Sequence, residues 1–474
     1  MKEASGIPFS AIVFDDAGDA PRYRQLYAHI RDLILTGSMP AGLRLPSSRE
    51  LATEIGVSRN TVIAAYELLV DEQFAESITG RGTVVRDIPT LAGDVVRNAG
   101  ARTATESTPM RMPFAVPDAA HFPVQAWTRV LRNSVKRSHP ANERPRIGGD
   151  ARLRKLICAY LGAYRGLRCR EEQVLITTGG QQGLYLAGKV LREFTNDVLI
   201  EDPGYLGARN AFLECGFRLH PVPVDDAGAC LESEQLSRVA GSHAIYLTPS
   251  HQFPMGPTLS LERRMDVLNR AQEQGNWIIE DDYDAEYRYD GKPLTALAGL
   301  DVTQRVIYIG TFSKVLSPDL RVGYIVVPDA LIDKFRAIKE SSDGAAPVLM
   351  QTAIADFLQD GYFQAHLRRM REVYRDKRDR LIELLDAHEL PITIQPQPAG
   401  MHVTLMLDED CSDVEVSKAL AERGFEAPAL SRHYLPETIA KQGLLVGFTN
   451  ADNADLQDFA IGLAAILLQK QQHD

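Results

Sequence analysis

The 474-residue sequence predicts two domains of different fold class. Residues 15–86 show helical periodicity followed by a short hairpin pattern, whereas residues 113–474 alternate apolar runs with amphipathic helical stretches. Between them, residues 87–112 have no sustained hydrophobic period and are typical of a linker. We therefore expect a small helical domain with a β-hairpin, joined to a large α/β domain whose mostly parallel sheet lies between helices.

The composition is that of an ordinary globular protein, with 45% hydrophobic and 24% charged residues. No apolar run approaches the roughly 20 residues that cross a bilayer, and no leader pattern begins the chain, so we expect a cytoplasmic protein without a membrane partner. The net charge of −11 argues against extensive nucleic-acid coating but permits one small basic module. Neither disulfides nor a metal site are expected from the cysteines, which are Cys158, Cys169, Cys215, Cys230 and Cys411.

The N-terminal domain is predicted to contain a helix, a tight turn and a second helix. Ser47 and Glu50 form a capping-box pattern, Gly56 ends the first of these helices, and Ser58 is placed to cap the second. An earlier helix ends before Gly37. Its apolar face is formed by Tyr23, Leu26, Tyr27, Ile30 and Ile34.

The second helix of such a pair can lie in the major groove of DNA, and its first turn, SRNT, carries suitable polar groups. The stretch AESITGRGTVV predicts a hairpin whose arginine could enter the neighbouring minor groove. A helical hairpin without any role in DNA binding is the alternative. The candidate DNA-binding residues are Arg44, Ser47, Arg49, Ser58, Arg59, Asn60, Thr61, Arg81 and Gly82.

Three motifs in this domain, LPSSRELA, GVSRNTV and GRGTVV, resemble the winged helix-turn-helix of the GntR regulator family. The resemblance covers residues 21–86 and implies double-stranded operator DNA as a partner. Acidic residues follow the second helix at Asp71, Glu72 and Glu76, so we expect a narrow basic face and strongly salt-dependent binding.

In the C-terminal domain, a polar loop holding Lys314 and Arg321 separates two strand-like runs, VIYI and VGYIVV. A solvated loop with two surface charges would also explain this pair. Asp281 and Tyr283 lie at the carboxyl end of another predicted buried strand, WIIEDD, where ligands bind in open α/β sheets. The alternative for its acidic run is a solvated strand end.

Pyridoxal 5′-phosphate requires an amine, a carboxylate beside the pyridine nitrogen, a donor near the phenolic oxygen and groups that bind the phosphate. Lys314 would be the amine that forms the Schiff base, Asp281 the carboxylate and Tyr283 the donor. The phosphate would be bound by Thr311, Ser313, Arg321 and the backbone amides of Gly179, Gly180 and Gln181, which open a predicted helix.

The motifs TTGGQQG, EDPGY, TPSHQFPMG, EDDYDAEY and GTFSKVLSPDLRVGY resemble those of fold-type I pyridoxal phosphate enzymes, the aspartate aminotransferase class. The resemblance runs from about residue 112 to the C-terminus. It implies that Tyr205 stacks on the pyridine ring. His251 and Gln252 stand near the place of an asparagine that usually lies beside the cofactor in that class.

Together the two halves resemble the MocR/GabR group, in which a GntR-type DNA reader is fused to an aminotransferase-like domain. This resemblance implies a homodimer, head to tail with exchanged domains, that senses pyridoxal phosphate and often a small amino compound. Arg209 and Arg432 are candidates for binding an effector carboxylate, because a guanidinium binds carboxylate bidentately, although either could be a surface charge.

The leading functional hypothesis is a transcription factor whose DNA binding is tuned by imine exchange with an effector amine at Lys314. A working aminotransferase with an appended DNA-binding domain is the alternative, and turnover to a keto acid would distinguish it. A cofactor-free DNA-binding scaffold is a third hypothesis, which absorption in the imine region would exclude.

Overall fold

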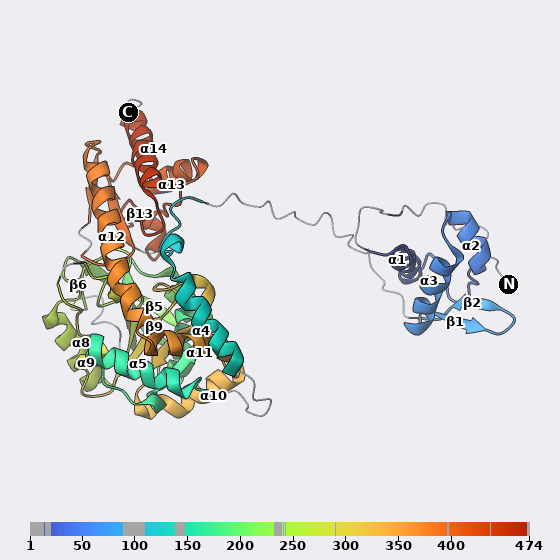
Figure 1. Cartoon of the computed structure of the whole chain (residues 1–474), viewed down its shortest axis with the longest axis horizontal. Helices are drawn as coiled ribbons and strands as arrows, with labels where there is room; N and C mark the ends of the chain where they lie inside the picture. Colours follow the sequence, from blue (N-terminus) through green and yellow to red (C-terminus); the bar gives the residue numbers. More distant parts are fainter. Residues whose placement is uncertain are drawn as a thin grey trace. The chain divides into compact units, whose positions relative to one another are not determined.

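The computed structural model describes residues 14, 20–88, 110–137, 147–231, 239, 241, 243–289, 291–395, 398–436 and 438–471. The chain divides into two compact units, Met1–Ser107 and Thr108–Asp474 (Figure 1). Most of the predicted linker, residues 89–109, lies outside the described ranges. Its last residue, Met112, is already buried in the core of the second unit.

The first unit contains three helices and a hairpin. They are α1 (Arg22–Leu35), α2 (Ser48–Ile55), α3 (Arg59–Asp71), β1 (Ala75–Ile78) and β2 (Gly82–Val85). The predicted capping box is confirmed, since Ser47 accepts from the Glu50 amide and the Glu50 carboxylate accepts from the Ser47 amide. Gly56 ends α2 at a φ of 69°, and Ser58 caps α3.

The core of the first unit joins α1 to α3. Leu26 and Ile30 of α1 and Val62 and Leu69 of α3 are fully buried against one another. Burying these faces fixes the direction of α3 and leaves its first turn, from Arg59, exposed to solvent.

An eight-stranded sheet forms the centre of the second unit, with the order β3-β10-β9-β8-β7-β4-β5-β6. Its strands are β3 (Val174–Thr177), β4 (Asp197–Asp202), β5 (Arg218–Asp225), β6 (Gly228–Ala229), β7 (Ala244–Leu247), β8 (Trp277–Asp282), β9 (Val306–Thr311) and β10 (Gly323–Val326). Strands β9, β8, β7, β4 and β5 are parallel, whereas β10 and β6 are antiparallel to their neighbours. The predicted mostly parallel sheet is confirmed.

Helices cover both faces of this sheet. They include α4 (Val124–Arg137), α5 (Ala151–Tyr164), α6 (Gly180–Leu191), α7 (Leu206–Glu214), α8 (Leu261–Gln274), α9 (Leu297–Leu300), α10 (Ile332–Ser342), α11 (Val348–Gln359) and α12 (Tyr362–Asp386). Alternate strand residues belong to different apolar clusters: Tyr308 and Tyr324 pack in one, and Ile309 and Ile325 in another. A strand buried on both faces needs apolar residues at consecutive positions, which explains the continuous apolar runs.

A smaller antiparallel sheet lies near the C-terminus, in the order β11 (Ile392–Ile394), β12 (His402–Leu407) and β13 (Gly443–Gly447). It packs with α13 (Asp413–Glu422) and α14 (Asn453–Gln471), which lie together in Figure 1. Within the described ranges, no helix is both long and apolar enough to cross a membrane.

Candidate functional site

One cavity of about 310 Å³ in the second unit brings together all ten predicted cofactor-binding residues. They come from the start of α6, the start of α7, the carboxyl end of β8 and the loop between β9 and β10. These ten are Gly179, Gly180, Gln181, Tyr205, Asp281, Tyr283, Thr311, Ser313, Lys314 and Arg321. Seven further lining residues were not singled out from the sequence, namely Phe114, Ala115, Leu184, Tyr246, Thr248, Phe253 and Pro318.

Lys314 lies three residues beyond β9, and its Nζ donates to the carbonyl oxygen of Ala115 at 2.9 Å. Its neighbours Val315 and Leu316 are buried, so the loop is not the solvated surface loop of the alternative interpretation. Burial lowers the pKa of Lys314, although nearby carboxylates oppose the effect. A lowered lysine pKa increases the fraction of neutral amine, the form that bonds to a carbonyl carbon.

Asp281, the penultimate residue of β8, lines the cavity and accepts a hydrogen bond from the Tyr246 hydroxyl at 2.9 Å. Burial raises the pKa of Asp281 to about 7, while the Tyr246 hydrogen bond acts in the opposite direction. No lysine or arginine of the described residues forms an ion pair with Asp281. A buried carboxylate that faces a cavity without a bonded cation fits a positively charged ring nitrogen.

Glu280 and Asp282 belong to the other face of β8, because successive side chains of a strand alternate. Glu280 accepts from the amides of Leu297 and Ala298 at 2.8 and 2.7 Å. Asp282 forms a buried ion pair with Arg165 at 2.8 Å. The acidic run is therefore not a solvated strand end: its two outer members anchor the strand, and Asp281 faces the cavity.

The start of α6 also lines the cavity and is suited to bind an anion. Gly179, at a φ of 95°, provides no side-chain cap, so the first backbone N–H groups of α6 have no capping partner from that residue, and Gly179, Gly180 and Gln181 all line the cavity. A Cβ on Gly323 would lie 2.8 Å from the Gly179 carbonyl carbon, so only glycine permits this close approach. Arg321 is exposed and forms no hydrogen bond or ion pair with the described residues. This combination fits a phosphate group.

Tyr283 is oriented by a histidine. Its hydroxyl lies 3.0 Å from Nδ1 of His251, which also lies 3.0 Å from an Asp284 carboxylate oxygen. Burial raises the pKa of Tyr283 well above its usual value, so the phenol stays protonated and can donate. Gln252 instead donates to the carbonyl oxygens of Pro203 and Phe253 and supports its own loop.

The two candidate effector-binding arginines do not line the cavity. Arg209, on α7, donates to the carbonyl oxygen of Tyr434 at 3.1 Å. Arg432 is exposed in the short 3-10 helix Leu430–His433, two residues before Tyr434. The structure thus places both arginines near one chain segment but not beside Lys314, and their role stays a prediction.

In the first unit, most of the candidate DNA-binding residues are exposed. Ser58 and Thr61 are linked by a 2.8 Å hydrogen bond between their hydroxyls, and the Arg59 guanidinium donates to the Ser48 hydroxyl at 3.3 Å. Arg81 lies in the turn of the β1–β2 hairpin. Since Ser47 and Ser58 already cap helices, their hydroxyls have a structural role independent of any DNA contact.

Comparison with known proteins matches each unit to a family. Residues 22–85 match the bacterial regulatory proteins of the gntR family, and residues 112–437 match aminotransferase class I and II. The probable rhizopine catabolism regulatory protein MocR of Rhizobium meliloti is 36% identical over 94% of both chains. The HTH-type pyridoxine biosynthesis transcriptional regulator PdxR of Corynebacterium glutamicum is 32% identical, over 91% of this chain and 93% of that protein.

Solved aminotransferases resemble the second unit. LysN, the α-aminoadipate aminotransferase of Thermus thermophilus complexed with N-(5′-phosphopyridoxyl)-L-leucine, superposes with a TM-score of 0.71 and 27% identity, over 77% of this chain and 93% of that one. Pyrococcus horikoshii kynurenine aminotransferase, solved with PMP, gives 0.69 and 26%, over 77% of this chain and 92% of that one. The predicted fold class is confirmed for both units. The chain therefore belongs to the MocR/GabR type of transcriptional regulator, which joins a GntR-family helix-turn-helix domain to an aminotransferase class I and II domain.

Proposed function

We propose that the protein is a pyridoxal 5′-phosphate-dependent transcriptional regulator that binds operator DNA and senses a small amino compound. The observation that carries this proposal is the single cavity containing an amine, a buried carboxylate and an open anion site, in a chain that also has a GntR-type domain. The cofactor, when bound, supplies an aldehyde carbon to which an amine bonds reversibly. Sensing then consists of the exchange of Lys314 for the amine of the effector at that carbon.

Each wall of the cavity has a separate task in this proposal. Asp281 would hold a proton on the ring nitrogen, Tyr283 would donate to the phenolic oxygen, and Tyr205 would stack on the ring. The start of α6 and Arg321 would bind the phosphate, together with Thr311 and Ser313.

A contact of Lys314 supports coupling between the cavity and the linker. Lys314 donates to Ala115, which lies only three residues beyond the predicted linker. Met112 and Ala115 have φ values of 54° and 52°, a left-handed conformation that costs non-glycine residues about 1 kcal/mol each. Because a Lys314 bonded to the cofactor has fewer N–H groups to donate, occupation of the cavity alters the contact that holds this strained segment.

The Tyr246 hydroxyl is expected to set the pH range of cofactor binding. It stabilises the charged form of Asp281, so Tyr246→Phe should raise the pKa of that carboxyl. As the pH is lowered, the Asp281 carboxylate of the variant should therefore become protonated, and stop holding the ring-nitrogen proton, at a higher pH than in wild type. A hydrogen bond to a charged group contributes about 1.5 kcal/mol, which corresponds to about one pH unit. Cofactor affinity is measured by fluorescence titration at several pH values. As the pH is lowered, we expect the affinity of the variant to fall with a midpoint about one pH unit higher than that of wild type.

Tyr308→Phe is the matched control, because the Tyr308 hydroxyl donates to Asp282 on the opposite face of β8. Its pH midpoint should equal that of wild type. Identical midpoints for Tyr246→Phe and wild type would contradict the assigned role of Tyr246.

Arg432→Ala is expected to weaken binding of a carboxylated effector while preserving cofactor binding and basal DNA affinity. A hydrogen bond between charged groups contributes about 1.5–3 kcal/mol, so the effector concentration for half response should rise about 10- to 100-fold. Operator binding is measured across an effector titration for wild type, Arg432→Ala and the control Arg168→Ala, an exposed arginine that lines a different cavity. A wild-type response from Arg432→Ala would exclude this residue as the carboxylate anchor.

An aminotransferase with an appended DNA-binding domain is the second candidate, favoured by the solved aminotransferases that share this fold. The cavity residues serve both functions, so turnover decides between them. When an amine is added, a regulator changes its absorption spectrum but releases no product. An enzyme releases a keto acid, which a coupled dehydrogenase assay detects.

We further propose a cytoplasmic homodimer with head-to-tail exchange of domains, as the family resemblance implies. Sedimentation equilibrium of the full chain tests this: a monomer at micromolar concentration would contradict it.

A further inference from the structure

Two cysteines of the second unit lie side by side outside the cofactor cavity. Sγ of Cys158, on α5, is 3.3 Å from Sγ of Cys169, in the segment between α5 and β3. Both residues are free thiols and half-buried. Their spacing of eleven residues gave no indication of this contact in the sequence, because the chain reverses direction after α5.

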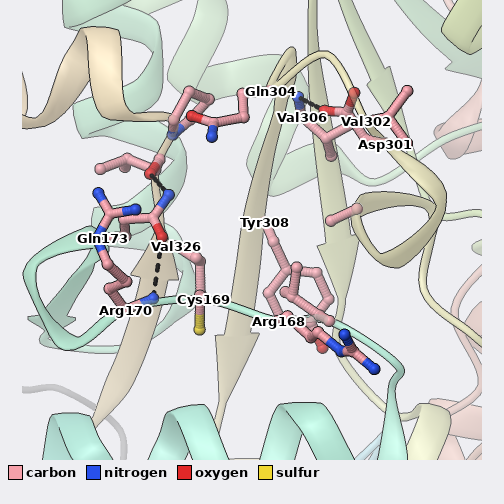
Figure 2. Close-up of a pocket in the computed structure, with 14 residues that line it drawn as sticks. Arg168, Cys169, Arg170, Gln173, Asp301, Val302, Gln304, Val306, Tyr308 and Val326 are labelled. Atoms are coloured by element: carbon pink, nitrogen blue, oxygen red, sulfur yellow. Dashed lines mark hydrogen bonds between the residues drawn. The ribbon is translucent and has the colours of Figure 1, made fainter.

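Cys169 can be reached from solvent. It lines an open cavity of about 320 Å³ together with Arg168 and Arg170, and Figure 2 shows its sulfur atom among the lining residues. This cavity shares no lining residue with the cofactor cavity. A small oxidant can therefore reach Cys169 without entering the proposed effector site. Cys158 is not among the residues that line this cavity, but it is itself only half-buried.

The two thiols are electrostatically unequal. Cys169 donates its S–H to the sulfur of Cys158, and this hydrogen bond lowers the pKa of Cys158, while burial opposes the effect. The same hydrogen bond, together with burial, raises the pKa of Cys169. The thiolate is the reactive form of cysteine, so Cys158 is the better nucleophile and Cys169 the better resolving thiol.

We propose that Cys158 and Cys169 form a reversible disulfide when the protein meets a peroxide. The Cys158 thiolate attacks one peroxide oxygen, the O–O bond breaks, and hydroxide leaves, which gives a sulfenic acid at Cys158. Sγ of Cys169 then attacks the sulfur of Cys158, the S–O bond breaks, and water leaves with the Cys169 proton. The hydroxide takes up the proton that the Cys158 thiol had lost, so two thiols are oxidised to a disulfide and one hydrogen peroxide is reduced to two waters; a dithiol reductant reverses the reaction.

The required movement is small. A disulfide has an S–S distance of about 2.05 Å, so the sulfurs must approach by little more than about 1 Å from their present separation. The loop that would be closed contains Arg165, which donates to Asp282 and to the Ser250 hydroxyl. The modification would therefore fix the segment that carries the ion-pair partner of Asp282.

Peptide mapping tests the proposal on the full-length wild-type protein. The reduced protein is treated with hydrogen peroxide, blocked with an alkylating agent and digested with trypsin without reductant. Cleavage after Lys155, Arg165, Arg168 and Arg170 places the thiols in different peptides, 156–165 and 169–170. We expect these two peptides linked, with a mass two hydrogen atoms below their sum, and the link should disappear on adding dithiothreitol.

Single-cysteine replacements test the order of attack and the specificity. In Cys169→Ser, dimedone should trap a sulfenic acid at Cys158, whereas Cys158→Ser should give little dimedone adduct at Cys169. Cys230→Ser, which removes another half-buried cysteine, should keep the linked peptides. The proposal would be overturned if both thiols of the wild-type protein were still alkylated after peroxide treatment. Random pairing among its five cysteines would also overturn it.

Discussion

Lys314→Ala protein is expected to lose all of the cofactor that wild type retains after borohydride reduction. Reduction fixes only a cofactor that is covalently bonded to a lysine, and Lys314 is the lysine that lines the cavity. Cofactor could still bind the variant noncovalently at the start of α6 and beside Asp281. The measurement is the mass of the reduced, denatured protein, with circular dichroism to confirm that the variant is folded.

Lys334→Ala is the matched control for this experiment. Lys334 is an exposed lysine of α10 in an ion pair with Glu193, and its removal leaves the cavity unchanged. This variant should retain the same covalent mass increase as wild type. Covalently retained cofactor in Lys314→Ala would assign the Schiff base to another lysine and remove the sensing step from the proposal.

Arg59→Ala and Arg81→Ala are each expected to weaken operator binding without changing the cofactor spectrum. A contact with a base should cost about 1–3 kcal/mol, roughly 5- to 150-fold in affinity, and relax specificity at one position. A contact with a phosphate should weaken binding to all sequences and reduce the salt slope by about one unit. Fluorescence anisotropy of labelled operator DNA at several salt concentrations distinguishes the two kinds of contact.

Arg31→Ala provides the charge-matched control in the same unit. Arg31 lies on α1 and pairs with Asp32, so its removal changes the net charge equally but touches neither α3 nor the hairpin. We expect it to bind operator almost as wild type does. If both Arg59→Ala and Arg81→Ala retained wild-type affinity, the reading helix and the hairpin would have to be reassigned.

Most strands of the central sheet could be predicted, because their continuous apolar runs are visible in the sequence. The predicted runs VIYI and WIIEDD lie in β9 and β8, since a strand buried on both faces has apolar residues at consecutive positions. β5 was not predicted, because its sequence RLHPVPVD contains two prolines and few consecutive apolar residues. Its neighbour β6 has only two residues, so part of β5 lies at the sheet edge, where proline is tolerated.

The residues of the candidate site could be named from motifs, but the contacts that other residues make with them could not be predicted. Tyr246 supports Asp281 from the neighbouring strand, and only the parallel pairing of β7 with β8 brings these residues together. Ala115 and Lys314 are 199 positions apart and lie in segments without a shared pattern. Such contacts follow from tertiary packing, which periodicity and residue spacing do not encode.

The central claim, that an amino compound at the Lys314 cavity changes DNA binding, is tested most directly by reciprocal titration of wild-type protein. Operator affinity is measured with and without a saturating amine that changes the absorption spectrum, and amine affinity is measured with and without operator. We expect each ligand to change the affinity of the other by the same factor, about 5- to 150-fold, because binding free energies are linked. Operator affinity that stays constant at saturation with every such amine would contradict the claim.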